Sequence, residues 1–429
     1  EGKIRVKLNQ SIDPSFVKFV DKNGIEMTAP FIANKTTAKS DTIEFDYSGL
    51  TYKTTYGIVV SCDDAVTGQK FESGTHTFLT TYPRVLVLEN PSLEPSASNP
   101  WLVYCAEAFN QIREPEFLGE GYYYKQMDDI DLSPSVYASD YNKSTTGWKP
   151  LGVMGETINT PFIGHYDGND MTIKNLTCNV QSDDTDSTPS LFGIIENGSV
   201  SNLGLEDVNL KGGFGVAAIA GLAENTTITN CHTTGEINGT NYIGGLIGQL
   251  RSGNIDDCNT TDLIIKGSIN VGGIVGHFGM SENSDNIVAT MKNCHSINIS
   301  LEASGQDAGI EGNIGGIVGL NGGKIINCSS SGKVISDECN VSGIVGCNGY
   351  WGSGYNLYGF VDSAKTTCEV KGYDFVAGII GYNFGNCTEY KLSFDGNIDP
   401  DFYKEPDPYG DPPYNPWYKD QIVNDAVPL

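Results

Sequence analysis

Two insertions rich in aromatic residues, glycine and asparagine hold the side chains best suited to contact a ligand. The first insertion begins at Phe278, and the second carries Tyr350, Trp351, Tyr355 and Tyr358. Aromatic rings beside glycine and asparagine offer sugars or proteins a large contact area at a small cost in conformational entropy. We therefore expect these five residues to form a binding surface. The alternative is that the rings fold back over the body of the protein and pack there.

The histidines are dispersed along the chain and form no motif. They are His76, His165, His232, His277 and His295. HExxH, GxSxG, phosphate-binding and dinucleotide-binding signatures are absent from the sequence, and no His or Cys spacing predicts a zinc site. We expect no catalytic residue, no metal and no cofactor. Calcium is compatible with the acidic composition, but no motif supports it.

The charge balance narrows the choice of partners. The formal net charge is −27, from 53 acidic and 26 basic residues. Nucleic acids and anionic membrane surfaces are bound through Lys and Arg clusters, so both are poor candidates. No apolar run approaches the ~18 residues of a membrane-spanning helix. The many carboxylates leave a glycosidase pair open.

One short glycine-containing hexad recurs in the second half of the chain. The copies are residues 216–221, 243–248, 271–276, 314–319, 341–346 and 376–381. Their third residues lie 27, 28, 43, 27 and 35 positions apart. The glycines at the third and sixth positions of the last five copies are Gly245, Gly248, Gly273, Gly276, Gly316, Gly319, Gly343, Gly346, Gly378 and Gly381. A period near 27 residues with occasional insertions is typical of a solenoid.

The unit at residues 314–336 indicates which kind of solenoid this is. It holds three short strand-like pieces, Gly-Gly-Ile-Val-Gly, Lys-Ile-Ile-Asn-Cys and Gly-Lys-Val-Ile. Gly and Asn separate them, and both tolerate a positive φ at a corner. Strands this short become stable when each pairs with its equivalents in the coils above and below, at ~4.8 Å. We predict an all-β chain whose main domain is a right-handed parallel β-helix.

The two aromatic insertions occupy equivalent places in this repeat. They follow Gly276 and Gly346, which are the last residues of the third and fifth of the six hexad copies. Both should emerge from one edge of the solenoid, two coils or ~10 Å apart. Insertions on one face of a solenoid are commonly its binding face.

Four cysteines recur at one place in successive units, each after Asn or Asp. They are Cys231, Cys258, Cys294 and Cys328. One interpretation is an interior ladder in which Cys acts as a small apolar residue. The other is a ladder of disulfides or metal ligands, since adjacent coils fall within the Cα distance of a disulfide. In-register β positions point their Cβ atoms in parallel, which disfavours bridging.

Composition divides the chain into five segments. We predict a β-sandwich at residues 1–82 and a linker at 83–100. An N-terminal cap with the first coils should follow at 101–180, the repeat region at 181–398 and a Pro/Tyr-rich C-terminal cap at 399–429. Apolar positions at helical spacing predict one short helix over 106–113, ended by Pro115. A solenoid needs such caps because an open coil exposes unpaired backbone and core.

Two families resemble parts of this chain. Residues 1–82 are similar to the bacterial Ig-like domains of surface proteins, on Ser11–Pro14, Tyr52–Tyr56 and Thr77–Thr80. The repeats resemble those of GLUG-motif proteins, a bacterial extracellular group. The features that they share are the hexad, the Asn-Cys pair that follows it and a Gly-x-Val/Ile strand. The resemblance covers roughly 105–395, and it departs at 216–221, where Ala217 and Ala218 replace the paired glycines. It implies secretion, a cell-surface location and a role in adhesion.

Two functions from different classes follow. The first is a non-catalytic extracellular, adhesin-like or structural module that presents loops from a β-helix to a host or cell-surface glycan or protein. Its location would be extracellular or on the bacterial surface, and a lipid anchor on a removed N-terminus is compatible with it. The alternative is a secreted polysaccharide-active enzyme or carbohydrate-binding module. An enzyme needs two carboxylates, or a carboxylate with Lys or Arg, that converge in one groove.

Overall fold

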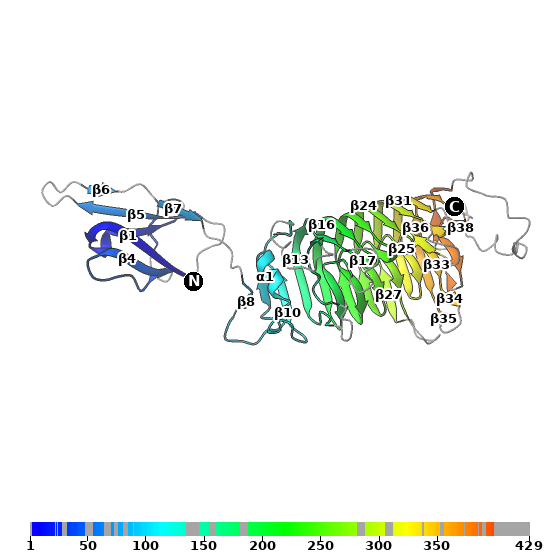
Figure 1. Ribbon diagram of the computed structural model, residues 1–429, viewed down its shortest axis with the longest axis horizontal. Helices are drawn as coiled ribbons and strands as arrows, with labels where there is room; N and C mark the ends of the chain where they lie inside the picture. Colours follow the sequence, from blue (N-terminus) through cyan, green and yellow to red (C-terminus); the bar gives the residue numbers. More distant parts are fainter. Residues whose placement is uncertain are drawn as a thin grey trace, which may run out of the picture. The chain divides into compact units, whose positions relative to one another are not determined.

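The computed structural model describes a β-rich chain that divides into two compact units, residues 1–83 and 84–429 (Figure 1). The described residues are 2–21, 23, 25–27, 32–47, 55–63, 70–72, 76–79, 85–88, 90–133, 146–153, 160–180, 188–280, 288–304, 312–336, 339–351, 356–372, 374–384, 386–387 and 392–398. The predicted C-terminal cap at 399–429 lies outside them.

The first unit consists of two antiparallel sheets around one small core. One sheet contains β1 (Gly2–Ile12), β4 (Ser40–Tyr47) and β3 (Ile32–Ala33), and the other contains β2 (Val17–Val20), β5 (Thr55–Asp63), β6 (Lys70–Glu72) and β7 (His76–Leu79), with a 3-10 turn η1 (Pro14–Phe16) before β2. The ring of Phe19 in β2 packs on Phe45 of β4 and on Tyr56 of β5, with both ring centroids at 5.7 Å. Side chains from both sheets therefore share one buried cluster, as the alternating strand pattern predicts.

The second unit begins with short elements that close the first coil. They are β8 (Val87–Leu88), β9 (Trp101–Val103), α1 (Ala106–Gln111), β10 (Tyr123–Gln126), β11 (Ile130–Asp131) and β12 (Thr146–Gly147). The helix α1 lies where the sequence predicts it. Its Phe109 is fully buried, stacks on Trp148 at 5.2 Å and meets Tyr166 edge to face at 5.3 Å. Large rings of the entry segment thus fill the end of the main core.

The segment that the sequence predicts to be a linker is ordered and belongs to the second unit. Asn99 is buried, and its amide donates hydrogen bonds to the carbonyl oxygens of Asn90, Leu93 and Glu94. Strand β8 pairs with β9. The prediction of a linker over 83–100 is therefore wrong for its described part. The Asn99 side chain holds this Pro- and Ser-rich loop in a folded conformation by hydrogen bonds to three of its carbonyl groups.

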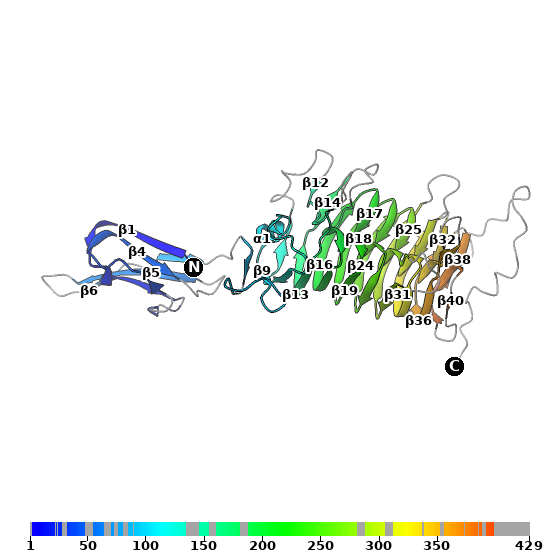
Figure 2. The same cartoon turned by 90° about the horizontal axis from the view of Figure 1, so that it is seen from below.

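Three parallel sheets then wind through the rest of the unit as a β-helix (Figures 1 and 2). The largest contains β13 (His165–Lys174), β14 (Thr177–Asn179), β16 (Ser199–Lys211), β19 (Thr226–Thr229), β20 (His232–Asn238), β23 (Gly253–Asp256), β24 (Asn259–Gly267), β27 (Ala289–Lys292), β28 (His295–Ala303), β31 (Lys324–Ser336), β36 (Phe360–Thr366), β37 (Glu369–Lys371), β40 (Asn386–Cys387), β41 (Leu392–Phe394) and β42 (Asn397–Ile398). A seven-stranded sheet contains β15 (Phe192–Glu196), β18 (Ala220–Glu224), β22 (Ile247–Leu250), β26 (Val275–Phe278), β30 (Val318–Asn321), β33 (Val345–Asn348) and β39 (Ile380–Asn383). A six-stranded sheet contains β17 (Phe214–Ala217), β21 (Asn241–Gly244), β25 (Ile269–Gly272), β29 (Gly312–Gly315), β32 (Cys339–Ser342) and β38 (Asp374–Ala377).

Each hexad is a corner between two of these sheets, not a single strand as its sequence suggests. In residues 271–276, β25 ends at Gly272 and β26 begins at Val275. A Cβ atom on Gly273 would lie 2.0 Å from the carbonyl oxygen of Gly316 in the next coil, and one on Gly276 would lie 2.6 Å from the backbone nitrogen of Ile243. Neither glycine has a positive φ. The hexad requires glycine because backbones approach closely, and not because of an unusual backbone conformation.

Positive φ values occur instead at the residue before each ladder cysteine. Asn230, Asp257, Asn293 and Asn327 have φ values between 50 and 53°. Asn and Asp tolerate this region better than other residues with a side chain. They turn the chain there and direct the next residue into the core.

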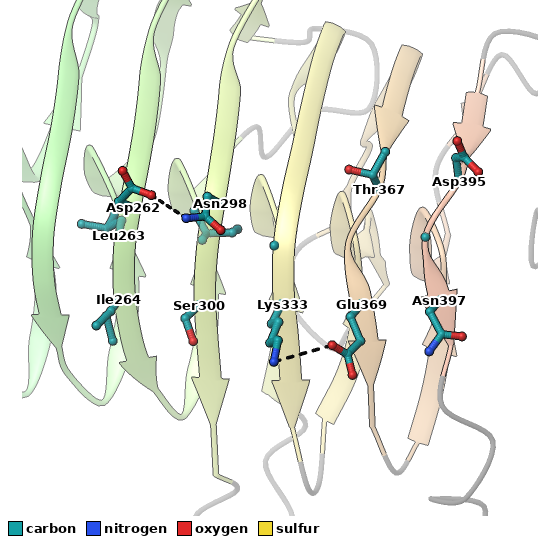
Figure 3. Close-up of a pocket in the computed structure, with 13 residues that line it drawn as sticks. Asp262, Leu263, Ile264, Asn298, Ser300, Lys333, Thr367, Glu369, Asp395 and Asn397 are labelled. Carbon is teal, nitrogen blue, oxygen red and sulfur yellow. Dashed lines mark hydrogen bonds and ion pairs between the residues drawn. The ribbon is translucent and has the colours of Figure 1, made fainter.

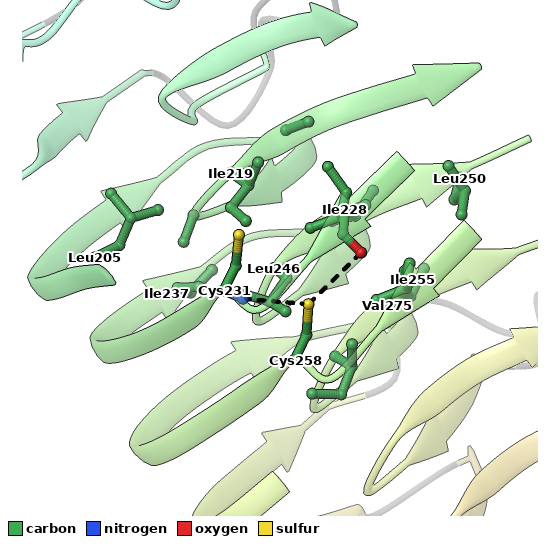
Figure 4. Close-up of a cluster of buried hydrophobic side chains, with 14 of the residues drawn as sticks. Leu205, Ile219, Ile228, Cys231, Ile237, Leu246, Leu250, Ile255, Cys258 and Val275 are labelled. Carbon is green, nitrogen blue, oxygen red and sulfur yellow. Dashed lines mark hydrogen bonds between the residues drawn. The ribbon is translucent and has the colours of Figure 1, made fainter. Parts of the chain in front are cut away.

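The four ladder cysteines are buried free thiols in the main core. Figure 4 shows the sulfur atoms of Cys231 and Cys258 in neighbouring coils, among Ile228, Ile255 and other apolar side chains. Burial raises the pKa of the Cys231 and Cys294 thiols well above the usual value. This placement agrees with the interior apolar ladder.

Candidate binding face

Both aromatic insertions follow strands of the seven-stranded sheet at the same corner. The first comes after β26 and the second after β33, and β30 lies between these two strands. The second insertion forms an antiparallel hairpin of β34 (Tyr350–Trp351) and β35 (Asn356–Leu357), in which Tyr350 pairs with Leu357. The predicted common edge, two coils apart, is therefore present.

One column of side chains runs along this sheet beneath the insertions. Strand register aligns Gln249, His277, Leu320, Cys347 and Tyr382 in five successive coils. Leu320 and Cys347 form a small buried cluster of their own, separate from the main core. We call this set the insertion column.

The hairpin packs onto the middle of the insertion column through one leucine. Leu357 of β35 is 3% exposed and closes the cluster of Leu320 and Cys347, with Tyr382 packed against it. Burying a leucine side chain contributes roughly 1.5–3 kcal/mol. The hairpin is thus anchored to the β-helix.

Met280, in the described start of the first insertion, contacts the N-terminal end of the same column. The side-chain amide of Gln249 donates hydrogen bonds to Nδ1 of His277 at 3.2 Å and to Sδ of Met280 at 3.0 Å. The backbone nitrogen of Met280 donates to the carbonyl oxygen of Arg251. His277 is 1% exposed, and burial, reinforced by Arg251, lowers its pKa to about 4. Its Nε2 has no hydrogen-bond partner within the described part of the chain.

Two exposed aromatic rings follow the strands of the last two coils of the column. Tyr350 in the hairpin is 39% exposed, and Phe384, just after β39, is 46% exposed. The Phe384 ring meets that of Tyr382 edge to face at 4.4 Å, and its backbone nitrogen donates to the carbonyl oxygen of Asn348. Tyr358 is half-buried just after β35. We call Tyr350, Tyr358, Tyr382 and Phe384 the aromatic rim.

The five predicted binding residues differ in their placement and exposure. Tyr350 and Tyr358 belong to the aromatic rim. Trp351 lies in β34, but its side chain and all of Tyr355 fall outside the described residues. Phe278 is fully buried in the main core, so its prediction as a binding residue is wrong. It is the last residue of β26, where Leu250 of the preceding coil is buried as well.

Sequence reasoning missed Tyr382 and Phe384. The residues that follow the hexads are Gln-Leu, His-Phe, Leu-Asn, Cys-Asn and Tyr-Asn. Superposing these pairs would have shown that one position changes from polar to aromatic along the array. The residue after these pairs is aromatic only in the last copy, where it is Phe384.

The other described histidines have local roles. His165 stacks on Tyr123 at 4.4 Å and lies 2.9 Å from Oγ of Ser199, and burial lowers its pKa. Nδ1 of His295 lies 2.8 Å from Oγ of Ser329. Within the described ranges, no three His, Cys, Asp or Glu side chains cluster as a metal site would require. None of the helices found there is long and apolar enough to span a membrane.

A second feature is an open polar groove on the largest sheet (Figure 3). It encloses about 870 Å³ and contains the carboxylates Asp262, Glu369 and Asp395. Glu369 forms ion pairs with Lys333 at 3.8 Å and with Lys371 at 3.1 Å. Three coils separate Asp262 from Glu369, or ~14 Å at the usual strand spacing. This exceeds the ~5–9.5 Å between the two carboxylates of most glycosidases.

Comparison with known proteins identifies the repeat. The GLUG-motif family profile matches residues 311–335. The chain is 32% identical over 132 residues to halomucin of Haloquadratum walsbyi, a match covering 30% of this chain and 1% of that protein. It is 30% identical over 196 residues to a protein named "Putative Gly-rich membrane protein" from Evansella cellulosilytica, covering 38% and 21%. It is 29% identical over 166 residues to immunoglobulin A1 protease of Streptococcus sanguinis, covering 37% and 8%.

These matches span 1%, 21% and 8% of the length of those relatives, respectively. Among solved structures, an IgA1 protease aligns with 93% of this chain and 29% of its own, at 14% identity and a TM-score of 0.43. The matched residues 311–335 include the corner between β29 and β30 and most of β31. The chain therefore carries the GLUG motif that its sequence predicts, within a parallel β-helix.

Proposed function

We propose that this chain is a non-catalytic, extracellular, adhesin-like module that binds a host or cell-surface glycan or protein through the aromatic rim. The observation that carries this proposal is the pair of exposed rings, Tyr350 and Phe384, held on adjacent coils. In this proposal the first unit is an Ig-like spacer. Trp351 and Tyr355 belong to the same insertion and remain predicted contributors.

Anchoring of the rim favours binding. Leu357 ties the hairpin to the insertion column, and the backbone bond from Phe384 to Asn348 ties the second ring to β33. Rings that are already held in place lose little freedom when a ligand arrives. Tyrosine and phenylalanine faces stack on apolar sugar faces or pack into protein surfaces.

The sequence relatives support an extracellular setting. One is named a halomucin, another a Gly-rich membrane protein and a third an immunoglobulin A1 protease. The strongly acidic charge keeps a chain soluble and monomeric at high concentration. Absence of catalysis is part of our proposal, and it is supported by the lack of HExxH, GxSxG, phosphate-binding and dinucleotide-binding signatures in the sequence.

The test is a glycan and matrix-protein array probed with the full chain, with and without Ca²⁺. We expect specific signals that the double variant Tyr350→Ala/Phe384→Ala loses. The matched control is Ile25→Ala/Ile297→Ala, which removes two exposed apolar side chains far from the rim in sequence. Thermal unfolding of each variant establishes that its fold is intact.

Parallel wells with soluble polysaccharides record any released product. Signal that survives in the rim variant would contradict the binding face. Release of product, abolished by Glu369→Gln or Asp395→Asn, would replace our proposal with the polysaccharide-active alternative. These two carboxylates lie in adjacent coils, since Glu369 pairs with Asn397.

A further inference from the structure

The groove of Figure 3 is built from two rows of side chains that repeat with the coils. The first row contains Asp262, Asn298, Thr367 and Asp395. The second contains Ile264, Ser300, Lys333, Glu369 and Asn397, which are aligned by strand register over five coils. At ~4.8 Å for each coil, the second row extends over ~19 Å.

Two glycines line the groove between these rows. Gly332 and Gly396 lie there, where neighbouring coils carry Leu263 and Ile299. Gly332 has a φ of 118°, and a Cβ on it would lie 2.1 Å from the carbonyl oxygen of Ile299. Leu263 and Ile299 are buried in the main core, so the side chains of the two rows, and not those between them, face the groove.

The chemistry of the lining selects against anionic ligands. Three carboxylates, Asp262, Glu369 and Asp395, line the groove with one ammonium group, Lys333. Glu369 is paired with Lys333 and with Lys371, so Asp262 and Asp395 supply the negative charge that no lysine in these ion pairs neutralises. Uronates, sialates and nucleic acids would be repelled. The amides of Asn298 and Asn397 and the hydroxyls of Ser300 and Thr367 donate and accept hydrogen bonds.

An extended peptide is a poor fit to this groove. Peptides that bind to sheets usually add a strand at a free edge. Strands β24, β28 and β31 are internal strands, and their backbone groups already pair with the neighbouring coils. The groove offers only side-chain polar groups, repeated once for each coil.

We propose that this groove binds an extended, uncharged glycan along the axis of the β-helix. A linear chain of 1,4-linked pyranoses advances by about the same length per residue as one coil, so successive sugars meet equivalent polar pairs. Carboxylates accept hydrogen bonds from neighbouring sugar hydroxyls. Ile264, 42% exposed at one end of the second row, offers an apolar contact to a sugar face. This site is distinct from the aromatic rim.

The experiment titrates the full chain with cello-, manno- and N-acetylated chito-oligosaccharides of increasing length, by calorimetry. For at least one series, we expect the affinity to rise up to about five sugars and then level off, because the groove spans that number of coils at ~4.8 Å each. Oligogalacturonates of the same lengths should not bind, because their carboxylates meet those of the groove.

Two groove variants test the location. Thr367→Ala/Asn397→Ala removes two exposed hydrogen-bonding side chains and should weaken binding about tenfold. Ser300→Trp places a bulky ring within the second row, next to Lys333, and should abolish the length dependence. The matched control is Thr227→Ala/Asn254→Ala, exposed residues of the same types on β19 and β23.

Several outcomes would overturn the proposal. They are the absence of binding by all three neutral series, affinity independent of length, and full affinity in a folded Ser300→Trp variant. Tyr350→Ala/Phe384→Ala should bind the oligosaccharides normally. Its behaviour separates failure of this groove from failure of the aromatic rim.

Discussion

The side chains of Gln249 and His277 lie in adjacent coils beneath the first insertion, with Gln249 Nε2 3.2 Å from His277 Nδ1. Both are buried, and the amide of Gln249 also reaches Met280 of the insertion. Met280 of the first insertion therefore contacts a polar pair, whereas the hairpin of the second insertion packs on Leu320 and Cys347. The contact of Met280 and the packing of the hairpin should therefore respond differently to acidic pH.

His277 should make stability depend on pH between about 6.5 and 4. Burial lowers its pKa to about 4 in the folded chain, whereas an unfolded histidine titrates near ~6.5. The unfolded state then binds more protons in this window, so stability falls as the pH drops and levels off below about 4. We expect this residue alone to lower the free energy of unfolding by about 3 kcal/mol as the pH falls through this window.

The variant His277→Leu isolates this effect, because leucine occupies the equivalent position in the next coil at Leu320. Urea unfolding at several pH values should show a smaller loss of stability below pH ~6.5 than in the parent. His232→Gln, at an exposed position, serves as the control. Identical pH profiles for the parent and His277→Leu would show that His277 carries no such linkage.

Alanine at Gly273 should destabilise the β-helix severely. Its Cβ would lie 2.0 Å from a backbone oxygen, and the stacked coils leave little room to move, so we expect a cost of about 3 kcal/mol or more. Gly267→Ala is the comparison, because there the nearest atom is the side-chain methyl Cγ2 of Val271 at 2.5 Å. Denaturant midpoints should separate the two variants, and equal midpoints would argue against close packing at the corner.

Truncation of Leu357 should release the hairpin without unfolding the β-helix. Leu357→Ala removes most of a buried side chain that belongs to the small cluster outside the main core, a local loss of about 2–5 kcal/mol. Limited proteolysis should cut within residues 349–358 much faster in this variant than in Tyr350→Ala. The main unfolding transition should stay within a few degrees. A large drop in the main transition would mean that the hairpin supports the whole β-helix.

The ladder cysteines should resist thiol reagents until the protein unfolds. Cys231, Cys258, Cys294 and Cys328 are almost completely buried, and thiolates are the reactive species. Burial raises the pKa of Cys231 and Cys294. Alkylation read site by site by mass spectrometry should label these four residues only in denaturant. Rapid labelling of Cys258 in the native chain would contradict the buried ladder.

The repeat was readable because a β-helix copies its constraints from coil to coil. Gly273 and Gly316 meet each other across adjacent coils, so both positions exclude a side chain and recur visibly. The corner residues Asn293 and Asn327 recur for a similar reason. The hexad was nevertheless expected to be a strand, because glycine beside branched apolar residues does not reveal where two sheets approach closely.

The candidate site was only partly predictable. The insertions after Gly276 and Gly346 stand out by their length and aromatic content. Their packing does not, since Phe278 turns into the main core and Leu357 closes a separate cluster. Tyr382 and Phe384 lie about 30 residues after Tyr350 in the chain, but on the adjacent coil.

The sequence by itself determined the solenoid, its period, the recurring position of the four cysteines and the corner at which the insertions leave. Each of these follows from local sterics or from a residue type repeated at equivalent positions. The tertiary structure alone decided which aromatic rings are exposed, that Asn99 orders the segment before the cap, and that Asp262 to Asp395 line one groove. Such features depend on which side chains from different coils meet. Stacking sets those neighbours about one period apart in the chain, a distance at which local sequence patterns carry no information about contact.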